Sequence, residues 1–138
     1  SLGSVEDFDL WLRLVAAGAR LDYSREVLVR YRRGAHSLSS DANRMLHDGI
    51  TTLDKARREL PLSPAERAAL EQGLTRLRSE LSYRMGLSAL RRGEAELARR
   101  EFANVKRWNS NIRLRALQVA LRVAPRLAVS AYRHIRGE

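Results

Sequence analysis

A long run of apolar residues at helical spacing in the middle of the chain limits the folds that the chain can adopt. Ser63-Pro64-Ala65-Glu66 combines a capping serine, proline at the first helical position and glutamate three residues after the serine, which is a strong helix start. Apolar residues then keep a helical spacing to about Leu90, at Leu70, Leu74, Leu77, Leu81 and Met85. Such a helix is about 40 Å long, more than the width of a small domain. We therefore expect a mainly helical chain in which other helices pack along this one.

The same spacing predicts helices on both sides of the long one. A helix is expected to begin near Ser40 or Asp41, whose side chains can accept hydrogen bonds from free amides, and to stop at Pro61. Gly93 should close the long helix, and Glu94 should begin the next. Trp108-Asn109-Ser110-Asn111 indicates a turn. Two further helices are marked by Leu114, Leu117 and Leu121 and, from Pro125 on, by an apolar face of Leu127, Ala131 and Ile135.

Small and aromatic residues on the long helix and its successor are spaced for close packing. Gly86, Ala98 and Phe102 stand at the 12- and 4-residue offsets that let two antiparallel helices approach each other. This pattern resembles one tetratricopeptide unit, although Ser82 and Ala89 occupy the positions where tryptophan and tyrosine are expected. A single unit cannot bury its own faces. We therefore expect the pair to pack on neighbouring helices instead of forming an array.

The first residues of the chain carry an acidic helix start. Glu6, Asp7 and Asp9 stand in the first turn of a predicted helix, where free N–H groups and the macrodipole favour carboxylates. The apolar face of this helix is expected to hold Phe8, Leu12 and Val15, with Trp11 and Leu14 beside them.

The residues after Ala16-Ala17-Gly18, which should end this helix, change to a strand pattern. Leu21 and Tyr23 alternate with polar neighbours, Ser24-Arg25-Glu26 indicates a turn, and Val27-Leu28-Val29 followed by Tyr31 has the composition of a short strand. The predicted order is helix, strand, turn, strand.

Residues 1–33, continued by His36-Ser37-Leu38-Ser39, resemble the C-terminal end of the catalytic domain of a bacterial family 2 glycosyltransferase of the GT-A fold. Members of that family carry a Glu-Asp pair opening a helix of the form DxxLWLR, then a strand ending in Tyr-Arg and a loop rich in His and Ser. Here the pair is Glu6-Asp7, the helix reads DFDLWLR to Arg13, and Tyr31-Arg32 follows the predicted strand.

The resemblance implies that residues 1–39 end a glycosyltransferase catalytic domain and that residues 40–138 form a helical extension. The nucleotide-binding half, with its metal-binding DxD loop, would precede Ser1, so we expect a fragment that is inactive alone. The expected fold class is mainly α: an N-terminal helix plus short β-strands, the remnant of a GT-A α/β domain, followed by a multi-helix bundle or hairpin extension. The intact enzyme is expected to use a divalent metal, Mg²⁺ or Mn²⁺, which this fragment alone is not expected to bind. Its expected substrates are a nucleotide-sugar donor and a glycan or lipid-linked acceptor.

The resemblance also assigns catalytic roles to the acidic pair. In an inverting transferase a carboxylate removes the proton from the incoming hydroxyl as the nucleoside diphosphate leaves the anomeric carbon. By position in the motif this base would be Asp7, with Glu6 beside it orienting the acceptor or the loop. A carboxylate at a helix start stays ionised at neutral pH, as a base must. The alternative is that these side chains merely satisfy the helix terminus.

Asp7-Phe8-Asp9 also spells DxD, but we expect no metal site there. Side chains at i and i+2 of a helix point apart, so the two carboxylates would not share an ion. Asp9 is expected to pair with Arg13 at i+4.

Arg32 and His36 are the candidates for binding the substrate's diphosphate. In the family the loop often reads YR-x-His and its basic side chains reach the diphosphate or its metal. Here Gly34 holds the third position after Tyr31, and the histidine follows two residues later. A guanidinium offers bidentate hydrogen bonds to phosphate, which suits Arg32. The alternative for His36 is a solvated loop histidine.

The composition excludes some kinds of site and suggests where the protein is located. The chain has no cysteine, which excludes disulfides and thiolate metal sites, and no apolar run near the ~20 residues of a membrane span. A cytoplasmic location follows, with a peripheral place at the inner face of the membrane as the alternative. The net charge of +10 belongs to the tail: residues 61–138 hold 16 basic and 7 acidic side chains, against 10 and 9 in residues 1–60.

The arginines of the last two predicted helices interleave with apolar residues and allow three interpretations. They are solvated on a packed helical extension, they lie on an anionic membrane surface, or they bind nucleic acid, for which positive charge alone is a poor argument. We expect no nucleic-acid partner. An open strand edge also favours a homodimer of the fragment. The rival function from another class is a non-enzymatic helical module for protein interaction or membrane surfaces.

Overall fold

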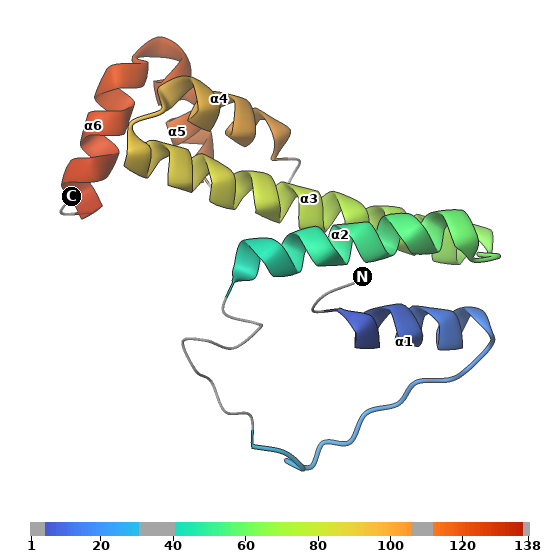
Figure 1. The fold of residues 1–138 in the computed structure, drawn as a ribbon. Coiled ribbons are helices and arrows are strands. Elements are labelled where there is room, and N and C mark those ends of the chain that lie inside the picture. The colour runs from blue at the N-terminus through green and yellow to red at the C-terminus, as the bar shows by residue number, and fades with distance from the viewer. Residues whose placement is uncertain (1–4, 31–40, 106–111, 137–138) are drawn as a thin grey trace. The chain divides into compact units, whose positions relative to one another are not determined.

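The computed structural model describes residues 5–30, 41–105 and 112–136, which contain six α-helices (Figure 1). Their bounds are Glu6–Ala16 for α1, Ala42–Glu59 for α2, Pro64–Arg92 for α3, Ala95–Asn104 for α4, Ile112–Val123 for α5 and Pro125–Arg136 for α6. The chain divides into two compact units, residues 1–74 and 75–138, and the division falls within α3. Each unit has a core of its own, and the two are described separately.

The predicted helix starts are confirmed at the level of single hydrogen bonds. The Asp41 carboxylate accepts from the backbone N–H groups of Asn43 and Arg44, at 3.1 and 3.0 Å, and so caps α2. At the start of α3 the Ser63 N–H donates to the Glu66 carboxylate at 2.8 Å, and the Glu66 N–H donates to the Ser63 hydroxyl at 3.3 Å. This reciprocal pair is the capping box that the sequence predicts.

Two glycines end helices as predicted. Gly18 follows α1 with φ of 89°, and Gly93 follows α3 with φ of 81°, a region that side chains disfavour. The turns close with bonds from the Ala19 N–H to the Leu14 carbonyl and from the Glu94 N–H to the Ala89 carbonyl, each at 2.9 Å. These bonds satisfy carbonyls that the helix ends would otherwise leave without a partner.

The first unit is built from α1, α2 and the N-terminal part of α3. Leu53 and Ala56 of α2 and Leu70 and Leu74 of α3 are buried, which confirms the apolar row expected on α3 at its first two positions. α1 packs along α2. Thr52 is fully buried, and its hydroxyl donates to the Asp48 carbonyl within the same helix at 2.9 Å. The buried hydroxyl therefore costs little, because it has a hydrogen-bond acceptor.

The second unit joins the C-terminal part of α3 to α4, α5 and α6 around one apolar cluster. Its buried members are Ala89, Leu90, Ala98, Phe102, Leu121, Ala128 and Val129. Because Leu121 belongs to α5 and Ala128 to α6, the helix pair with the tetratricopeptide-like spacing packs on the two following helices. The expectation that a lone pair would use its neighbours in this way is confirmed.

The expected β-strands are absent, and this corrects the predicted fold class. Residues 19–30 form neither helix nor strand, and every described element is helical. Val27, Leu28 and Val29 are 92%, 72% and 77% exposed. A strand needs a neighbouring backbone to receive its hydrogen bonds, and a lone two-stranded hairpin is marginally stable at best. The alternating sequence offers side chains for a sheet, but the described chain has no other strand with which this segment could pair.

The prediction of which face of the last helix is buried is also wrong. α6 buries Ala128 and Val129, whereas Leu127 and Ile135 of the expected face are 72% and 81% exposed. The turn predicted at Trp108–Asn111 and the loop at Gly34–Ser40 lie outside the described residues. Among the helices that the structure describes, none has the length and apolar character to cross a bilayer.

Candidate functional site

The acidic first turn of α1 presents two carboxylates to solvent. The carbonyl of Val5, the N-cap residue, accepts from the N–H groups of Phe8 and Asp9 at 3.1 and 3.2 Å, and among the described residues no side chain caps the helix. Glu6 and Asp7 stand in this first turn and are exposed. Neither of them forms an ion pair with a described residue. They are therefore placed where a ligand could reach them.

Asp9 has a different environment, because it ties α1 to α2. Its carboxylate accepts from the Arg13 guanidinium at 2.9 Å and lies 3.4 Å from the ammonium of Lys55. Arg13 in turn reaches Glu59 of α2 at 2.9 Å. The hydrogen bond from Arg13, aided by the charge of Lys55, holds the pKa of Asp9 below its ordinary value. The predicted Asp9–Arg13 pair is confirmed, and Asp9 is an ion-pair residue of the fold.

Sequence reasoning missed the α2 half of this network. Lys55 and Glu59 are spaced i, i+4 on α2, and Asp9 and Arg13 have the same spacing and the opposite order of charge on α1. Two such complementary pairs on neighbouring helices indicate a four-residue ion-pair network. This signal was available in the sequence.

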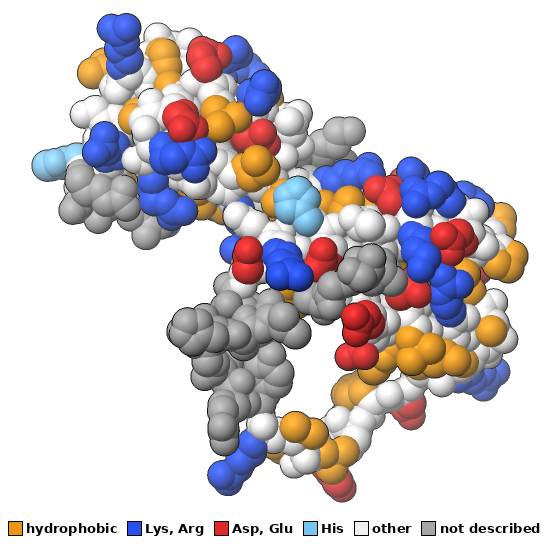
Figure 2. Space-filling model, viewed as in Figure 1, with side chains coloured by type: hydrophobic (Ala, Val, Ile, Leu, Met, Phe, Trp, Pro, Cys, Tyr) orange, Lys and Arg blue, Asp and Glu red, His pale blue; other side chains and the backbone are white. Residues whose placement is uncertain are grey.

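Asp7 lies at one end of an exposed apolar face. Leu10, Trp11 and Leu14 follow it at i+3, i+4 and i+7, so the four side chains share one side of α1. Trp11 is 55% exposed, and its two leucine neighbours are similarly open. Figure 2 shows apolar side chains gathered over α1 and along the segment that follows it. The Asp7 carboxylate thus borders an exposed apolar surface.

The opposite face of α1 borders an apolar groove of about 330 Å³ in the first unit. Glu66 is the one charged residue among those that line it, and neither Glu6 nor Asp7 contributes. The lining residues come from α1, α2, α3 and the link between α2 and α3: Phe8, Leu12, Val15, Ala16, Leu53, Ala56, Leu60, Leu62, Glu66, Ala69, Leu70 and Gly73. This groove is where the predicted apolar face of α1 meets the core.

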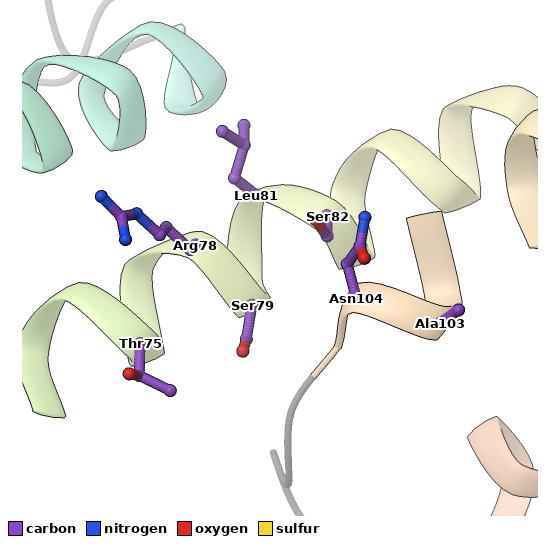
Figure 3. Close-up of a pocket in the computed structure, with 7 residues that line it drawn as sticks. All are labelled: Thr75, Arg78, Ser79, Leu81, Ser82, Ala103 and Asn104. Atoms are coloured by element: carbon purple, nitrogen blue, oxygen red, sulfur yellow. The ribbon is translucent and has the colours of Figure 1, made fainter. Parts of the chain in front are cut away.

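A second, more polar pocket of about 430 Å³ belongs to the second unit (Figure 3). It lies between α3 and the end of α4, and five of its residues come from α3. Five of its seven lining residues carry a hydroxyl, amide or guanidinium group, and the full set is Thr75, Arg78, Ser79, Leu81, Ser82, Ala103 and Asn104. It contains no carboxylate or histidine, so its groups can bind a polar ligand but offer no general base at neutral pH.

Arg32 and His36, the predicted diphosphate-binding residues, lie outside the described residues, as does Tyr31. Within the described ranges, no group of three or more histidine, aspartate or glutamate side chains is arranged to hold a metal ion. Comparisons with protein-family models, with curated proteins and with solved structures gave no match to this chain.

Proposed function

We propose that this chain is the C-terminal part of an inverting glycosyltransferase in which Asp7 is the general base and Glu6 orients the acceptor. The observation that carries this proposal is the contrast within one turn: Asp9 is held by Arg13 and Lys55, whereas Asp7 is exposed. The ion pairs give Asp9 a structural role, so it does not compete for the role of base. The Glu-Asp pair, the DFDLWLR helix and the following Tyr31-Arg32 support the same assignment through their likeness to family 2 glycosyltransferases.

The exposed apolar surface of the first unit supports the same proposal. Leu10, Trp11 and Leu14 lie on the Asp7 side of α1, and Val27 and Val29 are open on the segment after it. Contiguous exposed apolar surface marks a place where other protein or a ligand docks. A catalytic domain seated on this face would shield Asp7 from bulk water and place it beside the acceptor.

In the proposed reaction Asp7 takes the proton of the acceptor hydroxyl while the oxygen bonds to the anomeric carbon of the donor. The bond from that carbon to the diphosphate oxygen breaks in the same step, and the nucleoside diphosphate leaves with its electron pair. A divalent metal in the intact enzyme would supply positive charge to the departing diphosphate. Arg32 and His36 are proposed to contact that group, and the enzyme is proposed to work in the cytoplasm or at the inner face of the membrane.

The test is turnover by the intact enzyme, followed as release of nucleoside diphosphate from UDP-, GDP- and TDP-sugars. Asp7→Asn should lower kcat at least about 100-fold and leave the donor Kd unchanged, because a general base contributes on the order of 10²–10⁴. Glu26→Gln is the control, since it neutralises an exposed carboxylate outside α1 and its ion pairs and should retain the rate. Normal turnover by the Asp7 variant would refute the assignment.

A specific observation favours the rival function, a non-enzymatic helical interaction module. The α3–α4 pair packs Gly86 against Phe102, two of the residues whose spacing resembles one tetratricopeptide unit, and a pocket lies between the same helices. In that case Ser82→Ala and Asn104→Ala would weaken capture of a partner, whereas Asp7→Asn would have no effect. The two functions therefore differ in which variant changes the phenotype.

A further inference from the structure

The outer face of α5 carries an apolar stripe that the fold leaves exposed. Ile112, Val119 and Val123 are spaced by seven and four residues, which places them on one side of the helix, and all three are exposed. Leu121 on the opposite side is buried, with Leu114 and Leu117 packed beside it. α5 is thus apolar on two faces, and the core uses one of them.

Exposed apolar side chains also occur where α6 begins. Val123 ends α5 and Leu127 lies in the first turn of α6, with Pro125 between them, and these two side chains are 80% and 72% exposed. Ala131 and Ile135 extend the exposed row at four-residue intervals beyond Leu127. The α5–α6 corner, defined here as residues 122–127, therefore presents two large exposed apolar side chains at the short turn between the helices.

Every charge on these helices is positive. Residues 112–136 contain six arginines and no aspartate or glutamate. Arg115, Arg122, Arg126 and Arg133 are exposed, so no carboxylate on either helix offsets their charge. Arg122 and Arg126 each directly precede one of the two exposed apolar residues of the corner. This arrangement combines basic groups and apolar side chains within one turn of each other.

We propose that the α5–α6 corner binds the surface of an anionic lipid bilayer. Arg122 and Arg126 would contact lipid phosphates, and Val123 and Leu127 would enter the boundary between headgroups and acyl chains. The charge selects an anionic partner, and the apolar residues favour a bilayer over nucleic acid. Tyr132, the one tyrosine of α5 and α6, packs against the core, so these helices expose no tyrosine, phenylalanine or tryptophan on which bases could stack. This inference does not depend on the role of Asp7.

Sedimentation of this chain with vesicles of phosphatidylcholine, with and without phosphatidylglycerol, tests the proposal. We expect binding to the anionic vesicles at low salt, little binding to the neutral ones, and weakening as salt is added. Val123→Ser/Leu127→Ser should lower the partition coefficient about tenfold or more, because both side chains leave water on binding. Arg122→Gln/Arg126→Gln should lower it about 25-fold, since each basic residue near the surface contributes about fivefold.

Matched controls distinguish binding by this corner from nonspecific binding through exposed apolar residues or positive charge elsewhere in the chain. Val27→Ser/Val29→Ser removes two exposed apolar residues from the first unit, and Arg58→Gln/Arg67→Gln removes two exposed arginines there. Both controls should bind vesicles like the wild type, and circular dichroism should show the same helix content in all variants. The proposal fails if the chain ignores anionic vesicles at low salt, or if corner and control variants lose binding equally. It also fails if duplex DNA displaces the vesicles, the glutamine variant loses DNA binding and the serine variant binds vesicles like the wild type, because the corner would then be a nucleic-acid site.

Discussion

The ring of Phe102 fills the space beside Gly86, so that a Cβ added to this glycine would lie 2.8 Å from two ring carbons. Phe102 is fully buried, and it also contacts Tyr83 with ring centroids 6.0 Å apart. A glycine inside a helix costs about 1 kcal/mol relative to alanine. The fold accepts that cost at Gly86 because α4 can then lie directly against α3.

Gly86→Ala should therefore destabilise the chain although alanine is the better helix former. The buried ring cannot rotate away from the new methyl group without disturbing the core, and overpacking of this kind costs about 1–3 kcal/mol. Urea unfolding followed by circular dichroism measures the change. Gly73→Ala is the control: its Cβ would lie 3.3 Å from Leu53 Cδ1, the end of a flexible side chain. That variant should be near neutral, and a Gly86 variant as stable as the control would contradict the packing described here.

Removal of the capping box should weaken the start of α3. Ser63→Ala deletes the hydroxyl that accepts from the Glu66 N–H, and loss of such a cap costs about 1 kcal/mol. Chemical denaturation at neutral pH gives the difference from the wild type. Ser130→Ala, at an exposed serine inside α6, is the control and should show no loss.

The same box predicts a pH dependence of stability. The hydrogen bonds from the Ser63 hydroxyl and N–H hold the pKa of Glu66 below its ordinary value of 4.5. The stabilisation is therefore complete well above pH 4.5 and is lost as the pH falls through the lowered pKa. Glu66→Gln should remove this part of the acid dependence, measured as the midpoint of urea unfolding across pH 3 to 7. An unchanged acid profile in the variant would show that Glu66 does not contribute to it.

The ion-pair network of Asp9, Arg13, Lys55 and Glu59 should control how tightly α1 is held on α2. Asp9→Asn removes the carboxylate shared by Arg13 and Lys55, so the amides of α1 should exchange with deuterium faster while those of α2 keep their rate. Because the pKa of Asp9 is lowered, the wild type should lose the same protection of α1 as the pH falls from 3.8 through that lowered pKa, measured after correction for the slower intrinsic exchange of amides in acid. Glu26→Gln, which neutralises an exposed carboxylate outside the network, should leave α1 unchanged.

The sequence predicted those parts of the fold that depend on local chemistry. Asp41 and Ser63 start helices because capping requires only residues within one turn, and Gly18 and Gly93 end them for the same reason. The prediction failed where the structure of a segment depends on the other segments that it packs against or pairs with. Val27 and Val29 have strand composition but no second strand among the described residues with which to pair. α6 has two apolar faces, and packing against the other helices decides which of them is buried. The candidate site follows this rule too: the Asp9–Arg13 pair was predicted, whereas its continuation to Lys55 and Glu59 was not.

The exposed segment after α1 leads to the last prediction, which concerns proteolysis. Arg20, Arg25 and Arg30 lie in exposed backbone without helix or strand, so trypsin should cut this chain there before it cuts after the helical Arg44 or Arg58. Mass spectrometry of the first products identifies the sites. In the intact enzyme implied by the proposed function, the catalytic domain would cover Val27 and Val29, so cleavage after Arg25 and Arg30 should slow at least about tenfold, because proteolysis needs local opening of covered backbone. Equal cleavage rates in the short chain and the intact protein would show that no catalytic domain packs on this segment, and the glycosyltransferase assignment would lose its structural support.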